Sequence, residues 1–145
     1  MTDLSRRLSE ETSKIRIAAT ALMLSVGLYA LAWGVMISAT LYGAWTSPVL
    51  GVDLPGAVSA LSLRQLIQVY ATMLAVAAGA ATSLVWPRAG WIIFAAGAAL
   101  HITVWVERVG SPYYEGGPGF IFLGLGLLAL GLQYRYAFRA DEGGD

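Results

Sequence analysis

The chain has 145 residues, of which 57% are hydrophobic and 12% are charged, and its formal net charge is zero. Zero net charge removes the electrostatic basis for nucleic-acid binding. The lack of cysteine removes disulfides, thiolate catalysis, iron–sulfur clusters and cysteine-based zinc sites. Because soluble domains usually carry roughly 25% charged residues, the sequence predicts an all-α, polytopic integral membrane protein, with the whole chain as one membrane domain.

A long uncharged stretch predicts the first of four membrane-spanning helices, over residues 17–42, since no charged residue occurs between positions 17 and 52. At about 1.5 Å per residue this helix covers roughly 39 Å, which is enough to cross the hydrocarbon core with some tilt. The stretch is much longer than the apolar region of a cleaved signal peptide. Residues 1–14 form a cytoplasmic tail of mixed charge that can continue the helix in amphipathic form.

The connection over residues 46–61 is unusually apolar for a loop. Its large apolar residues are Val49, Leu50, Val52, Leu54 and Val58. Such a segment is poorly suited to water. We therefore expect it to lie on the bilayer surface, to fold over the mouth of the bundle or to be covered by a partner.

The second span is predicted over residues 66–86. Ser62 and Gln65 form the pattern of a capping box at its start, and Pro87 follows its end. The third span is predicted over residues 89–106 and ends at Glu107 and Arg108.

The fourth span is predicted over residues 119–134. It follows Gly117 and Pro118, and a proline in the first turn of a helix loses no hydrogen bond. Residues 140–145 form a short acidic tail in the cytoplasm.

Basic residues predict the orientation of the bundle, because lysine and arginine gather on the cytoplasmic side of short loops. With four crossings, seven of the nine basic residues share the side of both termini: Arg6, Arg7, Lys14, Arg16, Arg88, Arg135 and Arg139. Only Arg64 and Arg108 fall on the other side. Both termini are therefore expected in the cytoplasm.

Regularly spaced small residues predict close helix contacts, since membrane helices associate through small residues that let their backbones approach. These residues are Gly27, Gly34, Ala71, Ala75, Gly79, Ser83, Gly117, Gly124 and Gly131. The stripes either pack this bundle internally or bind a partner.

Polar residues inside predicted spans require a reason, because they are costly in hydrocarbon. We interpret these residues, together with charged residues at the helix ends, as an outward-facing polar pocket for a small anion, a lipid headgroup or a quinone ring. The six pocket residues are Arg64, Gln68, Thr72, His101, Glu107 and Arg108. Asp53 or Glu115 could gate it from the loops, although both sit in turn-forming sequence. The alternative is one structural hydrogen bond between Gln68 and His101, with Glu107 and Arg108 as interfacial anchors. A single histidine supports no bis-histidine haem and no common zinc site.

The layout from Gly43 to Tyr134 resembles the small four-helix DoxX-like membrane proteins. The resemblance rests on the segment from Pro48 to Pro55, on Arg64 and Tyr70 at the start of the second span, and on Arg108 before a loop rich in glycine and proline. It implies a fold and no defined activity.

The sequence thus favours a non-catalytic accessory or structural subunit of a larger membrane complex in a bacterial inner membrane. Its expected partners are the lipid bilayer and other membrane subunits or further copies of itself, with no cofactor and no metal. The alternative is a small homo-oligomeric transporter or channel with its polar pocket near His101. An enzyme is disfavoured because Glu107 and His101 occupy different faces of one helix.

Overall fold

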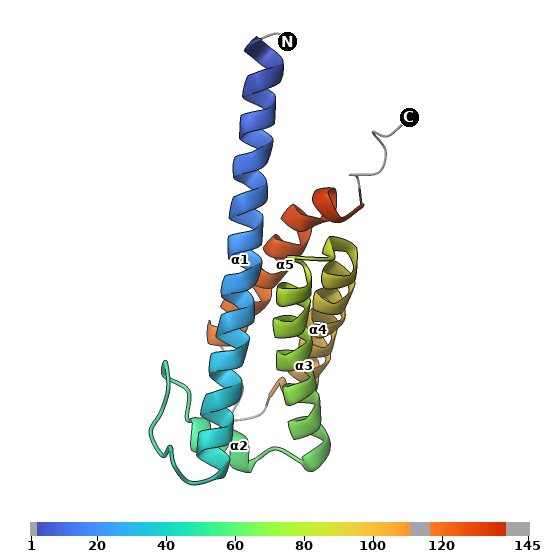
Figure 1. The fold of residues 1–145 in the computed structure, drawn as a ribbon. Coiled ribbons are helices and arrows are strands. Elements are labelled where there is room, and N and C mark those ends of the chain that lie inside the picture. Colours follow the sequence, from blue (N-terminus) through green and yellow to red (C-terminus); the bar gives the residue numbers. More distant parts are fainter. Residues whose placement is uncertain (1–2, 111–116, 139–145) are drawn as a thin grey trace.

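A computed structural model describes residues 3–110 and 117–138, and within them the regular structure is helical apart from one isolated bridge between Val49 and Val52. Five helices follow one another along the chain: α1 (Asp3–Leu41), α2 (Leu54–Ser59), α3 (Leu63–Thr82), α4 (Pro87–Arg108) and α5 (Gly117–Phe138) (Figure 1). Glu115 and the predicted tail 140–145 lie outside the described residues.

Three segments are long and apolar enough to cross a membrane, namely Glu10–Leu41 in α1, Leu63–Thr82 in α3 and Pro87–Arg108 in α4. The apolar part of α5 is shorter, Gly119–Tyr134. The predicted all-helical class with several apolar helices is therefore confirmed.

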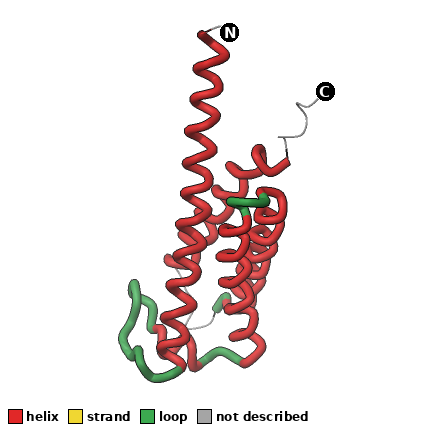
Figure 2. The backbone as a smooth tube through the Cα atoms, in the orientation of Figure 1, coloured by secondary structure: helices red, strands yellow, loops and turns green. Residues whose placement is uncertain are grey.

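The four long helices form a ring in which each packs on two neighbours. α1 and α4 lie across the ring from each other, and both contact α3 and α5. The tube drawing shows the connections at the two ends of the bundle (Figure 2). α1 begins and α5 ends toward one end of the bundle, and α2 lies at the opposite end (Figure 1).

α1 packs into the ring through a coiled-coil-like stripe. Its buried hydrophobic residues alternate in steps of four and three: Ala19, Met23, Val26, Ala30, Trp33 and Ile37. This spacing keeps one face of a helix against its neighbours over many turns. Residues 10–18 of the same helix are exposed, and α1 extends past the rest of the bundle there (Figure 1).

α3 and α4 form the tightest pair, because glycines bring their backbones together. A Cβ atom added at Gly79 would meet the backbone of Phe94, and one added at Gly90 would meet the backbone of Ser83. A Cβ atom at Gly97 would lie 2.9 Å from the backbone nitrogen of Val76. The two antiparallel helices are thus locked in one register.

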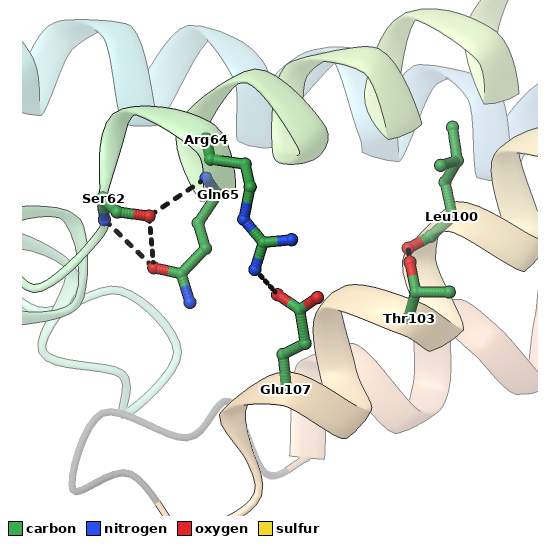
Figure 3. Close-up of polar contacts among 6 residues, drawn as sticks. All are labelled: Ser62, Arg64, Gln65, Leu100, Thr103 and Glu107. Carbon is green, nitrogen blue, oxygen red and sulfur yellow. Dashed lines mark hydrogen bonds and ion pairs between the residues drawn. The ribbon is translucent and has the colours of Figure 1, made fainter.

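The start of α3 matches the prediction, and its end differs. Ser62 and Gln65 form the predicted capping box: the Gln65 backbone N–H donates to Ser62 Oγ at 3.3 Å, and the Ser62 N–H donates to Gln65 Oε1 at 3.0 Å (Figure 3). The helix ends at Thr82, before the predicted Trp86, because the N–H groups of Leu84 and Val85 donate three residues back, to the carbonyls of Ala81 and Thr82, in a tighter turn. Pro87 is therefore the first residue of α4 and does not end α3.

The apolar loop folds back over the bundle, which was one of its three expected placements. Asp53 caps α2 by accepting a hydrogen bond from the Gly56 N–H at 3.2 Å. Leu54 and Val58 of α2 are buried against Trp33 and Ile37 of α1. The loop thus supplies part of the core at this end.

We expect Gly79→Ala to destabilise the bundle by about 1–3 kcal/mol, because the added methyl group overpacks against the Phe94 backbone. The matched control is Gly124→Ala, where no described atom lies within 4 Å of the added Cβ. There the better helix propensity of alanine should leave stability equal or raise it by about 0.5–1 kcal/mol. Melting temperatures of the purified variants in one detergent check the order, and equal values for both variants would contradict the close contact.

Candidate functional site

At the end of the bundle where α2 lies, called the outer end below, Arg64 of α3 and Glu107 of α4 form an ion pair. The Arg64 Nη2 atom lies 2.9 Å from Glu107 Oε2, and the two side chains are 69% and 32% exposed (Figure 3). Exposed pairs of this kind contribute about 0–1 kcal/mol. This pair therefore joins the helix ends and does not line the interior.

An interior cavity lies deeper, where all four long helices meet. Thr72 of α3, His101 of α4 and Gly119 of α5 border it together with residues of α1. Its volume is about 30 Å³. Thr72 is 2% exposed, so its hydroxyl belongs to the interior of the bundle.

A second cavity adjoins the first and runs outward between α3 and α4. It shares Thr72, Met73 and His101 with the first cavity and reaches Arg108 at the end of α4. Its volume is also about 30 Å³. We call the two together the Thr72–His101 pocket.

Arg108 lies at the outer end of this pocket. Its side chain is only 8% exposed, and its Nη2 atom lies 3.5 Å from the Ala57 carbonyl oxygen near the end of α2. The carbonyl end of a helix favours a cationic side chain. The folded-back loop therefore covers Arg108, which the sequence predicted either in the polar pocket or as an interfacial anchor.

Several polar atoms in this region are buried without a hydrogen bond among the residues that the structure describes. They are Gln68 Oε1, Thr72 Oγ1 and His101 Nε2. Buried polar groups in native proteins are nearly always paired with protein or water. These unpaired atoms are therefore the feature that distinguishes this site from the rest of the apolar core.

The register of α3 and α4 explains the arrangement. Gly97 packs on Val76, and one helical turn outward from these residues lie His101 and Thr72, which border the same cavities. One further turn outward, Gln68 lies at the same height along the bundle axis as Trp105, and His101 lies one turn deeper. Neither Gln68 Oε1 nor His101 Nε2 has a hydrogen-bond partner within the described ranges.

Three of the six predicted pocket residues, Thr72, His101 and Arg108, line the interior cavities. Gln68 is half-buried beside them, whereas Arg64 and Glu107 pair on the outside. Asp53 caps α2 and does not reach the pocket as a gate.

The small residues predicted to pack helices differ in how deeply they are buried. Gly27, Gly79 and Ser83 are buried between helices, while Gly34, Ala71 and Ala75 are half-buried. Gly124 and Gly131 of α5 are exposed, and a Cβ atom at either would meet no described atom within 4 Å. The surroundings of Gly117 lie outside what the structure describes.

Sequence reasoning missed the aromatic wall of the pocket. Tyr29, Trp33 and Phe122 line the inner cavity. The Phe122 ring centroid lies 4.6 Å from that of His101 and 5.6 Å from that of Tyr29. The spacing of four between Tyr29 and Trp33 was the available signal, since it places both rings on one face of α1.

Hydrogen bonds between helices were also missed. Tyr70 Oη lies 2.7 Å from Ser38 Oγ, joining α3 to α1. Gln133 Nε2 donates to Thr20 Oγ1 at 3.0 Å, joining α5 to α1. These pairs are distant in sequence, and no local pattern links them.

Within residues 3–110 and 117–138, no group of three histidine, aspartate or glutamate residues is placed to hold a metal ion. No family model, no curated protein and no solved structure matches the chain. The resemblance to DoxX-like proteins therefore stays a prediction, and the proposals below rest on physical arguments alone.

Proposed function

We propose that the chain crosses the plasma membrane of a bacterium four times, with both termini in the cytoplasm. Three helices have the length and hydropathy for crossing, and α5 spans 22 residues beside them. The bias of basic residues supports this orientation. The start of α1 and the end of α5 lie toward one end of the bundle (Figure 1), as an even number of crossings requires.

We further propose that the protein is a non-catalytic accessory or structural subunit that packs against other membrane subunits or further copies of itself. The open glycine face of α5, formed by Gly124 and Gly131, is the observation that carries this proposal. Elsewhere, Gly79, Gly90 and Gly97 each admit a neighbouring helix backbone to close contact. The α5 face has the same capacity for close approach, and no described residue uses it.

The exposed first part of α1 also supports assembly. Residues 10–18 are exposed and helical, and they project beyond the bundle (Figure 1). Most helices gain their stability from packing along one face. A cytoplasmic partner would supply that packing.

A small transporter or channel remains the second candidate, because the Thr72–His101 pocket places unpaired polar atoms inside a largely apolar bundle. In the described conformation the pocket does not continue inward. Phe94, Met23 and Val76 are at most 1% exposed and fill the bundle below it. Transport would therefore require this core to open.

Reporter fusions test the topology. Alkaline phosphatase fused after Ser47 should be active, because this position falls outside the cell, and the same enzyme fused after Phe138 should be inactive. A fluorescent protein at Phe138 should give the reverse result. An active phosphatase at Phe138 would mean that α5 does not cross and would overturn the four-span proposal.

Extraction from native membranes into polymer-bounded lipid discs tests the assembly. The protein should appear in particles larger than a monomer, and Gly124→Leu or Gly131→Leu should shift it to smaller particles by blocking close approach. Ala96→Leu, at an exposed position on α4, should leave particle size unchanged. A wild-type protein that is extracted as a monomer without partners would overturn the accessory-subunit proposal.

Reconstitution separates the two candidate functions. If the chain is a transporter, liposomes with entrapped pH- or chloride-sensitive dyes should show flux that His101→Ala abolishes and that Thr103→Ala, an exposed α4 position, preserves. If the chain is an accessory subunit, both variants should lack flux, as should the wild type. His101→Ala would then alter only stability.

A further inference from the structure

We propose that the Thr72–His101 pocket binds a small cluster of water molecules, which enters from the outer end of the bundle past Arg108 and stops at the packed core. This site goes beyond the subunit role proposed above and rests only on the four-span topology. Its ligand class is water, held by one hydroxyl and one imidazole. The bound water would supply hydrogen-bond partners to polar atoms in the outer half of an otherwise apolar bundle.

The need for water follows from the buried polar atoms. Thr72 is 2% exposed, and its Oγ1 atom has no hydrogen-bond partner in the described structure. The same holds for His101 Nε2, which borders the same cavities. A buried hydroxyl left unpaired is unfavourable in proteins, and hydrocarbon around the bundle offers no substitute partner.

The space fits water and little else. Each of the two cavities measures about 30 Å³, and on this measure one water needs roughly 10–15 Å³. Each cavity therefore accommodates about two waters. A lipid headgroup or a quinone ring would require the helices to move apart.

Thr72 and His101 can anchor such a cluster because both residues line both cavities. A bound water needs two to four polar partners, and Thr72 Oγ1 and His101 Nε2 provide two at the junction. Arg108 also lines the outer cavity. The walls of the inner cavity are otherwise rich in rings, with Tyr29, Trp33 and Phe122.

Along the bundle axis, the pocket extends toward the outer end. Its outer cavity reaches Arg108, and His101 lies seven residues, or roughly 10 Å, below that helix end. Toward the inner end, Phe94 and Val76 are 0% and 1% exposed and close the bundle. Water should therefore exchange with the outer face and not with the cytoplasm.

Water-edited solid-state NMR tests the occupant directly, since His101 is the only histidine in the chain. Protein labelled with 15N-histidine in deuterated-lipid liposomes should show magnetisation transfer from water to the imidazole. Thr72→Val removes one anchor at nearly constant volume and should weaken the transfer several-fold. Thr103→Val is the matched control, because the Thr103 hydroxyl donates to the Leu100 carbonyl at 2.7 Å in its own helix (Figure 3).

Each other outcome overturns the proposal. A wild-type imidazole without transfer from water would mean a dry cavity, and transfer from a co-purified solute would mean a different ligand. Equal transfer in Thr72→Val would mean that Thr72 does not anchor the cluster. Because the test reads the ring's contact with water, its result does not depend on whether the protein assembles with a partner.

Cysteine accessibility tests the direction, because the natural chain contains no cysteine. In sealed vesicles, silver ion added on the outer side should react with Thr72→Cys and protect it from alkylation after unfolding. Val76→Cys, one turn deeper on the same face, should stay unprotected. Protection of Thr72→Cys from the cytoplasmic side, or its absence from the outer side, would overturn the outward opening.

Discussion

The close contact between α3 and α4 is the constraint on which the rest of the structure depends. Gly79 and Gly97 let the two backbones approach closely. A Cβ atom at Gly79 would meet the backbone of Phe94, and one at Gly97 would meet Val76. Because the contact involves backbone atoms, it fixes the register of the pair, and neither helix can slide by a turn without a clash. That register also determines which polar residues of α3 and α4 lie at the same height along the bundle axis.

The polar pocket is a consequence of this register. One turn outward from the glycine contact, Thr72 and His101 come to the same cavities, and at the helix ends Arg64 comes within 2.9 Å of Glu107. α1 and α5 then complete the walls, since the stripe on α1 carries Trp33 inward beside Tyr29. The apolar segment around α2 covers Arg108 at the outer end. A few small residues thus place a hydrophilic site inside a bundle built mostly of apolar side chains.

The glycines of this chain serve two purposes that look alike in the sequence. Gly79, Gly90 and Gly97 are used within the bundle, where a methyl group would meet another backbone. Gly124 and Gly131 show the same regular spacing but remain open on α5. The difference is whether the glycine-bearing face of the helix points toward another helix of the bundle or away from it. That direction is set by how the helices pack together. The glycines at the contact between α3 and α4 therefore explain the fold, whereas those on α5 support a proposal about partners.

The sequence by itself determined the helical class, the capping box at Ser62 and the presence of polar residues within the apolar runs. These are local or periodic properties, set by hydropathy and by hydrogen bonds between near neighbours. Only the tertiary structure decided that α3 stops at Thr82, that the loop folds back over Arg108, and that His101 is level with Thr72 and Gln68 with Trp105. It alone separated Arg64 and Glu107 from the pocket and brought Tyr29 and Phe122 into it. Those outcomes depend on the rotation and register of packed helices, which are set by contacts between residues far apart in the chain.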